Sequence, residues 1–349
     1  MRIAVCHPHT PFARGGAELH TERLVVALRD AGHDVDVVSL PFKWYPPTEL
    51  VHQMAMWRSL DVTEANGIPI DVLIALRFPG YLVPHERKVV WLIHQHRTAY
   101  ELWDHPAYAD LSPHEEGEAV RDMIHRSDRL ALGEAKRVFT NSGNVRDRLR
   151  RSLGIEADPL YHRSPLCEAL MDTRPGGHGD YVLFPSRLES IKRQSLAVEA
   201  MRHVRSGVRL VLVGSGPDEA ALRDQVEGLG LGGRVVLEGR VPDQRLIELY
   251  CGALAVYYGP FDEDFGYVTL EGMAACRPVV ATADSGGPLE FVRDGHNGLV
   301  VAPKPRAIGA AFDRLAADGV APAALGAAGR ATVAQLVPEW PEVVARLLS

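Results

Sequence analysis

The sequence has few cysteines and no long apolar run. Only four of its 349 residues are cysteine, at positions 6, 167, 251 and 276, and none belongs to a C-x-x-C pair. The spacing therefore lacks the pattern of a zinc site or of a dithiol redox centre. No run of 18 apolar residues occurs, and His7 and Pro8 interrupt the N-terminal stretch before a signal-peptide core can form. We expect a cytoplasmic protein with reduced cysteines.

An excess of positive charge is also missing. The formal net charge is -7, which provides no overall field to attract nucleic acid or an anionic membrane. Residues 121–151 are an exception, with nine Lys or Arg against four acids in stretches that resemble helices. A solvated helix face explains this segment. The alternative is peripheral contact with an anionic acceptor or the inner face of a membrane.

The pattern of apolar runs indicates two α/β halves. The chain is long enough for two domains. Residues 2–40 have the order strand, glycine turn, helix, strand, which is a βαβ unit, and further runs occur at "DVLIAL", "VVWLIH" and "RVFTNS". After the Pro/Gly-rich segment 173–180 the alternation restarts with "YVLFPSR", "VRLVLVG", "RVVLEG", "ALAVYYG", "PVVATAD" and "GLVV". We predict two Rossmann-like, doubly wound domains at 1–172 and 180–332, with an amphipathic C-terminal stretch.

Two basic residues follow the first strand of the second half. Open parallel sheets bind ligands beyond the carboxyl ends of their strands. Arg187 follows "YVLFPS", and Lys192 begins the next predicted helix, so both cations belong at that edge. A planar guanidinium and an ammonium together suit a diphosphate. The alternative is a pair of surface cations bound to Glu189.

Two glycine-containing turns lie at the same predicted edge. Gly286 and Gly287 lie between a strand and a helix predicted to start at Pro288, where backbone amides could approach a phosphate. Gly214 and Gly216 follow another strand, although both pairs could equally be ordinary turns. The first half lacks G-x-G-x-x-G after its first strand, which argues against a nicotinamide site.

Two carboxylates in "GPFDEDFGYVTLEG" are spaced for a sugar nucleotide. Glu263 lies in the loop, and Glu271 lies five residues beyond Gly266 on the predicted helix, about 7 Å along its axis. Carboxylates accept strongly from hydroxyl groups, and Phe265 and Gly266 offer amides at the helix start. The alternatives are a D-x-D metal site at 262–264 and an acidic first helical turn.

In this order and spacing the motifs resemble the retaining glycosyltransferase family 4, with its GT-B fold of two Rossmann-like domains facing across a cleft. The resemblance covers most of the chain: "GGAE" at 15–18, Gly32-His33, His94, "RLESIK" at 187–192, "GSGP", "EDFGYVTLEGMAA", "GGPLEFV", "GLVV" and Trp340 in a terminal helix that returns to the N-domain (333–349). The sequence departs from the usual family wording at Ser186 and Arg193, where glycines are common.

The resemblance implies roles for these positions. Arg187 and Lys192 would bind the donor diphosphate, Glu263 the donor hexose and Glu271 the ribose. Gly16 would border the phosphates from the other domain. A histidine after the fourth strand would face the reacting sugar; strand spacing favours His94 over His96, and either could instead be a buried, hydrogen-bonded histidine.

The implied reaction is transfer of a hexose-type sugar from a nucleotide diphosphate, most commonly uridine diphosphate, to an acceptor hydroxyl. We see no nucleophile, so we expect a metal-independent, cofactor-free, retaining transfer driven by stabilisation of the leaving diphosphate, with hinge motion around 173–180. The alternatives are a nucleotide-sugar 2-epimerase and a non-catalytic GT-B binding protein. The acceptor, a glycan, lipid-linked sugar or natural product, is not identified; Trp44, Tyr45 and Trp57 could line its site or pack under a long loop.

Overall fold

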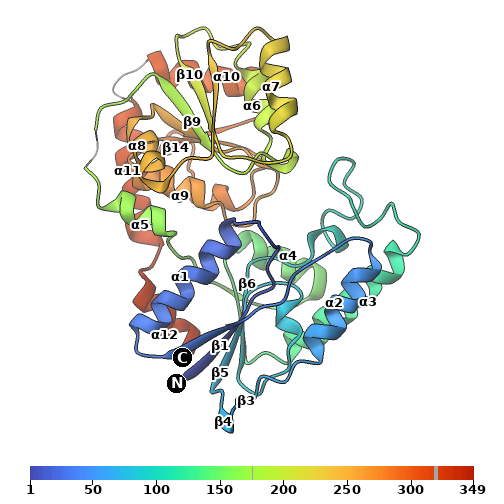
Figure 1. Ribbon diagram of the computed structural model, residues 1–349. Helices are drawn as coiled ribbons and strands as arrows, with labels where there is room; N and C mark the ends of the chain where they lie inside the picture. The colour runs from blue at the N-terminus through green and yellow to red at the C-terminus, as the bar shows by residue number, and fades with distance from the viewer. Residues whose placement is uncertain (175, 318–320) are drawn as a thin grey trace. The chain divides into compact units, whose positions relative to one another are not determined.

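The computed structural model describes residues 1–174, 176–317 and 321–349, and divides into two compact units (Figure 1). The first contains Met1–His162 and Glu339–Ser349, and the second contains Arg163–Pro338. Each unit is built on a six-stranded sheet. Two Rossmann-like α/β units are the GT-B architecture predicted from the sequence.

The first unit has a parallel sheet in the order β2-β1-β5-β6-β7-β8. The strands are β1 (Arg2–Cys6), β2 (Asp34–Val38), β5 (Val72–Ala75), β6 (Lys88–Leu92), β7 (Arg137–Thr140) and β8 (Asp158–Pro159). The strand order reverses between β1 and β5, which places a topological switch point there. Two short elements were not predicted: β8, and the antiparallel hairpin of β3 (Glu64–Ala65) and β4 (Ile68–Pro69).

Helices cover both faces of this sheet. They are α1 (Gly16–Asp30), α2 (Thr48–Arg58), α3 (Gly117–Gly133), α4 (Gly143–Leu153) and α12 (Trp340–Leu348), with 3₁₀ turns η1 (Gly80–Leu82) and η2 (Arg97–Ala99). Along β5, Val72 and Ile74 pack with α1 and α12, whereas Leu73 and Ala75 pack with α2, α3 and α4. Because successive side chains of a strand point to opposite faces, both apolar cores draw on every other residue.

Strand β2 is an edge strand of this sheet, and one of its faces carries charged side chains. Asp34 and Asp36 are exposed and alternate with Val35, which is buried. Charges on an edge strand discourage pairing with strands of other chains.

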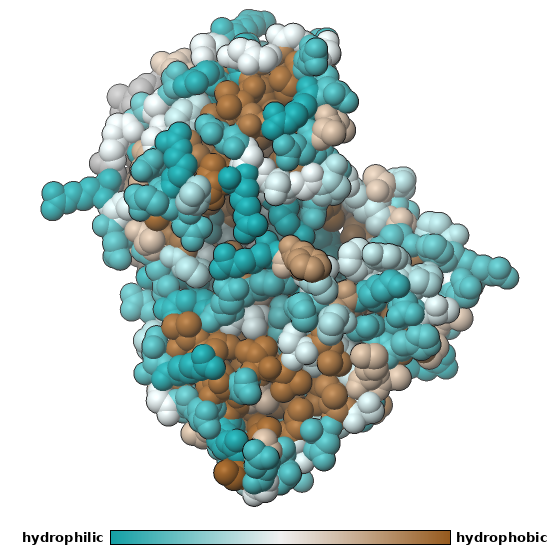
Figure 2. Space-filling model, viewed as in Figure 1, coloured by the Kyte–Doolittle hydropathy of each residue, from teal (hydrophilic) through white to brown (hydrophobic). Residues whose placement is uncertain are grey.

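On the face drawn in Figure 2 the surface is largely hydrophilic, and hydrophobic residues gather over the strands of the first unit. Val26 and Val37 are among its exposed apolar side chains.

The second unit has a parallel sheet in the order β11-β10-β9-β12-β13-β14. Its strands are β9 (Tyr181–Pro185), β10 (Arg209–Val213), β11 (Val235–Gly239), β12 (Ala255–Tyr257), β13 (Val279–Thr282) and β14 (Gly298–Val301). Its helices are α5 (Pro165–Met171), α6 (Gln194–Ala200), α7 (Glu219–Gly228), α8 (Asp243–Gly252), α9 (Tyr267–Ala274), α10 (Pro305–Ala317) and α11 (Ala321–Leu336), with 3₁₀ turns η3 (Ser190–Lys192) and η4 (Gly287–Glu290). The switch point lies between β9 and β12.

The segment predicted as a linker belongs to the second unit. The fully buried Arg277 donates to the carbonyls of Gly176 and Gly177, at 3.2 and 3.1 Å, and Arg330 donates to the carbonyl of Thr173 at 3.1 Å. Helix α5, expected before the boundary at 172, packs against α8 and α9 of the second unit. The chain passes between the units at 162/163 and again at 338/339, so residues 333–336 end α11 in the second unit, while α12 belongs to the first.

Candidate active site

Three loops meet at the switch point of the second unit. They follow β9, β12 and β13, and backbone hydrogen bonds join them. The N–H of Phe261 donates to Ile191 at 2.9 Å, that of Glu263 donates to Ser285 at 2.8 Å, and that of Gly287 donates back to Glu263 at 2.8 Å. The carboxyl ends of parallel strands meet at one end of a sheet, and these three loops contain Arg187, Lys192, Glu263 and the Gly286-Gly287 turn.

The two predicted cations lie on the loop after β9 and have different surroundings. The Arg187 side chain is 52% exposed and pairs with Glu189 at 3.0 Å, the alternative foreseen from the sequence. Lys192 is only 16% exposed; its Nζ contacts the carboxylate of Glu263 and lies 3.5 Å from the hydroxyl of Tyr258. Tyr258 donates to the same carboxylate at 2.9 Å. The structure thus brings Lys192 and Glu263 together, and adds Tyr258, which the sequence analysis did not single out.

Arg193 takes part in structure rather than extending the basic surface. It has φ +61°, a left-handed backbone that favours glycine. Its guanidinium makes two 2.9 Å hydrogen bonds to Asp284 and lies 5.0 Å from the ring centre of Phe261. Arg193 therefore ties together the loops after β9, β12 and β13, and its charge is balanced by Asp284. These contacts explain how an arginine is accommodated at a left-handed position where the related family commonly has glycine.

Gly214 and Gly216 allow the loop after β10 to pack against the loop after β9. A Cβ at Gly214 would lie 2.0 Å from the carbonyl oxygen of Ser186, and one at Gly216 would lie 2.2 Å from that of Leu188. The N–H of Leu188 donates to Ser215 at 3.1 Å. Both glycines are therefore required by close backbone packing, which is a reason for them besides any ligand contact.

The Gly286-Gly287 turn also has a packing reason. Gly286 has φ +71° and ψ -125°, and a Cβ at Gly287 would lie 2.5 Å from the carbonyl oxygen of Asp264. The helix predicted from Pro288 is the single 3₁₀ turn η4. Gly266 caps α9 with φ +86° and packs against Pro288. The first turn of α9 therefore lies against this loop, with Phe265 buried beside it.

Glu271, which the family resemblance assigns to the ribose, is buried on α9. It is 7% exposed; one carboxylate oxygen accepts from Ser164 at 2.6 Å and the other from Tyr250 at 2.7 Å. Burial raises the pKa of Glu271, although these two hydrogen bonds oppose the change. Each carboxylate oxygen can accept a second hydrogen bond. A ribose hydroxyl that bound Glu271 would therefore donate to an oxygen that already accepts from Ser164 or Tyr250.

The acidic run 262–264 does not form a metal cluster with the residues that the structure describes. Over the described ranges, no three His, Cys, Asp or Glu side chains are grouped to hold a metal ion. Glu263 is engaged with Lys192 and Tyr258. Its partners thus include a cation and a hydroxyl group.

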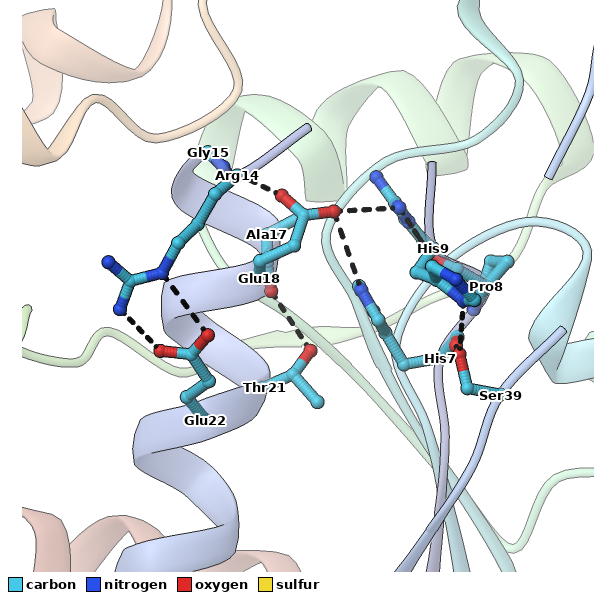
Figure 3. A network of polar contacts seen from close by, with 11 residues as sticks. His7, Pro8, His9, Arg14, Gly15, Ala17, Glu18, Thr21, Glu22 and Ser39 are labelled. Atoms are coloured by element: carbon cyan, nitrogen blue, oxygen red, sulfur yellow. Dashed lines mark hydrogen bonds and ion pairs between the residues drawn. The ribbon is translucent and has the colours of Figure 1, made fainter. Parts of the chain in front are cut away.

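In the first unit, Gly16 begins α1 at the switch point between β1 and β5. Gly15 is the N-cap, and its N–H donates to the Glu18 carboxylate at 2.9 Å, which is the half of a capping box that a glycine can make (Figure 3). Glu18 also lies 3.1 Å from Arg77 and 3.6 Å from His7. Burial opposes ionisation of Glu18, but His7, the charge of Arg77 and the Gly15 amide outweigh it and lower its pKa to about 2. The sequence analysis missed this cluster.

His94 and His96 lie in the loop after β6, and they differ in their contacts. His94 Nδ1 lies 2.6 Å from the carbonyl oxygen of Gln95. The ring of His96 packs 5.3 Å from that of Phe78, and burial together with nearby His94 lowers the pKa of His96 to about 3. His96 is therefore a neutral histidine among aromatic rings, and Phe42 also packs against it at 6.4 Å. Either histidine is partly exposed, so the choice between them stays open.

Of the three aromatic residues considered for the acceptor site, Trp57 is a core residue and not a surface residue. Its side chain is fully buried on α2, in the core formed with Leu50 and Met54. Trp44 and Tyr45 are 39% and 59% exposed, and their rings lie 5.3 Å apart. Trp57 is therefore a packing residue, whereas Trp44 and Tyr45 present apolar rings at the surface of the first unit.

The basic segment 121–151 is partly used within the protein. Arg148 is 5% exposed and lies 3.4 Å from Glu101, and Arg121 stacks 4.5 Å from the ring centre of Trp103. Arg146 and Arg150 both contact Asp147. In the described part of the chain, no single helix has the length and apolar character that crossing a membrane requires.

Comparison with known proteins identifies the family. The model of the family described as glycosyl transferases group 1 matches residues 173–332. The uncharacterized glycosyltransferase MJ1607 of Methanocaldococcus jannaschii is 36% identical over 360 residues, covering 91% of this chain and 90% of its own length. A D-inositol 3-phosphate glycosyltransferase of Acidothermus cellulolyticus is 29% identical over 340 residues, covering 82% of this chain and 74% of its own.

Solved structures agree on the fold. Sucrose-phosphate synthase from Thermosynechococcus elongatus superposes with a TM-score of 0.76 at 20% identity, covering 99% of this chain and 97% of that chain. Alr3699/HepE of Anabaena, solved with UDP and glucose, gives 0.69 at 18% identity, covering 100% and 98%. With two parallel-sheet units and a 36% identical glycosyltransferase along nearly its whole length, the chain belongs to the group 1 glycosyltransferases and is an enzyme of the GT-B fold.

Proposed function

We propose that the protein is a retaining, metal-independent transferase that moves a hexose from a nucleoside diphosphate sugar to an acceptor hydroxyl. The observation that carries the proposal is the contact of Lys192 with Glu263 at the switch point of the second unit. A donor would replace this contact with two complementary ones, a phosphate oxygen on Lys192 and a sugar hydroxyl on Glu263. The proposed roles of Arg187 on the diphosphate and Glu271 on the ribose are carried over from the family resemblance.

Charge development in the reaction explains why these groups suit it. Cleavage of the anomeric C–O bond leaves negative charge on the departing diphosphate, which Lys192, Arg187 and the amides of the glycine loops can stabilise. Glu263 accepts a hydrogen bond from Tyr258 and contacts Lys192, so we assign it to binding a sugar hydroxyl and not to attack on the anomeric carbon. We therefore assign front-face transfer, in which the acceptor proton passes to the leaving phosphate. The solved complexes of Alr3699/HepE with UDP and with UDP-glucose favour a uridine nucleotide as the donor.

The proposal is tested with a panel of nucleotide sugars in the presence of EDTA. UDP-glucose, UDP-galactose, UDP-N-acetylglucosamine and GDP-mannose are incubated with candidate acceptors, nucleotide release is measured, and the anomeric configuration of the product is read by proton NMR. We expect retained configuration and activity without added metal. An inverted product would refute the retaining mechanism, and loss of activity in EDTA that is restored by Mg²⁺ would refute metal independence.

Lys192→Met provides the matched test of the site. Removing a charge that stabilises the leaving group is expected to lower kcat by about 10²–10³-fold. Arg209→Met removes an exposed cation paired with Asp180 at the opposite edge of the same sheet and is the control. Equal activity of the Lys192→Met and Arg209→Met variants would contradict the assignment of Lys192.

A further inference from the structure

Tyr258 lies directly after β12 and contacts both members of the proposed donor-binding pair. It is 3% exposed, whereas the side chains of Lys192 and Glu263 are each 16% exposed. The Tyr258 hydroxyl donates to Oε2 of Glu263 at 2.9 Å, and Nζ of Lys192 lies 3.5 Å from the same hydroxyl. Lys192 also contacts Oε2 of Glu263. A buried phenol and a lysine ammonium therefore share one carboxylate oxygen.

The sheet of the second unit fixes the position of this tyrosine. The Tyr258 N–H donates to the carbonyl oxygen of Val280 on β13 at 2.9 Å. Its ring lies 6.2 Å from that of Phe184 on β9, with an angle of 82° between the ring planes. Gly266 packs closely against the same ring, since a Cβ there would lie 3.0 Å from Cε1 of Tyr258. A side chain with two torsions, packed in this way, keeps its hydroxyl in one place.

The two partners of Glu263 would respond differently to a donor. In the proposed function Lys192 exchanges its contact with Glu263 for a phosphate oxygen, and its flexible four-carbon stem allows that movement. Burial and the charge of Glu263 raise the pKa of Tyr258 well above its usual value, so the hydroxyl stays protonated and continues to donate. The carboxylate then keeps one charge-assisted hydrogen bond after the lysine has left it.

We propose that Tyr258 is a positioning residue for the donor sugar: its hydroxyl holds the Glu263 carboxylate in place when Lys192 passes to the diphosphate, so that Glu263 can bind a sugar hydroxyl. This assignment rests on the proposed function, because it takes the ligand to be a nucleotide sugar with its hexose on Glu263. All three residues belong to the second unit. Since Tyr258 acts through Glu263, its hydroxyl should matter for a nucleotide sugar and not for the nucleotide alone.

The neighbouring tyrosine provides a matched control. Tyr257 is fully buried, and its hydroxyl has no hydrogen-bond partner among the residues that the structure describes. By titration calorimetry, Tyr258→Phe is expected to weaken UDP-glucose binding about tenfold, while UDP affinity stays within about threefold of wild type. Tyr257→Phe removes a buried hydroxyl one residue away and should leave both affinities within about threefold. GDP-mannose and GDP replace these probes if the panel above selects that donor.

Dependence on Glu263 separates positioning from general support of the fold. In a Glu263→Ala background, Tyr258→Phe should change UDP-glucose affinity by less than about twofold, because the group that it positions is already absent. A tenfold loss that persists in that background, an equal loss of UDP and UDP-glucose affinity, or wild-type UDP-glucose affinity in Tyr258→Phe overturns the inference. Should Tyr258→Phe fail to fold, Tyr258→Met, whose flexible side chain also lacks the donor, takes its place. A wild-type protein that neither binds nor turns over any nucleotide sugar of the panel refutes the proposed function instead.

Discussion

Acidification is expected to weaken the first unit through two buried histidines. His20 on α1 and His162 after β8 are 2% and 1% exposed, and their rings stack 4.0 Å apart. Trp91 lies 4.2 Å from His20, and Trp340 of α12 lies 5.6 Å from His162. Burial lowers the pKa of His20 well below its usual value and that of His162 to about 3. Both histidines are therefore neutral in the folded protein at ordinary pH.

The size of the effect follows from proton linkage. The unfolded chain takes up protons at a histidine pKa of about 6.5, whereas the folded chain does not, so stability is complete above pH 6.5 and falls as the pH drops towards 3. Between pH 8 and pH 5, each histidine that stays neutral in the folded state lowers the free energy of unfolding by 2.303RT·log(1 + 10^1.5), which is about 2 kcal/mol. The pair together loses about 4 kcal/mol, a large part of the total for a typical domain.

Another buried group of the same unit acts in the opposite direction. Burial raises the pKa of Asp128 to about 7, even though Tyr100 donates to it at 2.8 Å. Because this acid is protonated more readily when folded, it contributes stability that grows as the pH falls below 7. The pH dependence of the wild type is therefore a sum, and the histidine contribution must be read as a difference from a variant that lacks both imidazole groups.

The assay is urea unfolding at pH 8 and pH 5, followed by tryptophan fluorescence. All five tryptophans belong to the first unit, at positions 44, 57, 91, 103 and 340, so the signal reports that unit. The loss of stability from pH 8 to pH 5 should be about 4 kcal/mol greater for the wild type than for His20→Phe/His162→Phe. His52→Phe, at an exposed histidine of α2, is the control. The same pH dependence in the wild type and the double variant would refute the reasoning.

Two pairs of substitutions test the structural role of Arg193 in the second unit and the burial of Trp57 in the first. Arg193→Gly should leave the unfolding free energy, measured by calorimetry, within about 1 kcal/mol of wild type, because relief of a left-handed backbone offsets the lost pairing; Asp284→Ala lacks that relief and should be the less stable variant. Trp57→Ala should destabilise the first unit by about 3–5 kcal/mol in urea unfolding, whereas Trp44→Ala should change stability by less than about 1 kcal/mol. Equal losses for the two tryptophan variants would contradict their different burial.

Most strands of the two sheets could be predicted because parallel strands are buried on both faces and appear as apolar runs. The runs at 72–75 and 279–282 are entirely buried, as the sequence indicates. Strand β8 was missed because it has two residues, one of them a proline, and no apolar run. Trp57 was misassigned although a signal existed: Leu50, Met54 and Trp57 are spaced at i, i+4 and i+7 on one face of a helix.

The partners of the site residues had no local signal. Glu271 is bound by Ser164, 107 residues away, and Arg193 by Asp284, 91 residues away. No spacing rule predicts which distant hydroxyl will meet a carboxylate, since that depends on how α5 packs against α8 and α9. Strand ends place residues at the correct edge of a sheet, but side-chain partners follow from tertiary packing.

The segment 173–180, predicted to separate the two domains, lies within the second unit, and its hydrogen bonds explain why. Pro and Gly at 173–180 predict a turn because they restrict or free the backbone, and composition cannot tell whether the turn's carbonyls face water or a buried donor. Here Arg277, just before β13, and Arg330, on α11, donate hydrogen bonds to these carbonyls. A guanidinium has five N–H groups, so each arginine can bind several carbonyls at once. A glycine-rich segment whose carbonyls are bound by the buried Arg277 and the partly buried Arg330 is fixed to the unit that contains those arginines. Substituting Arg277 would therefore act on the second unit's stability and not on a linker.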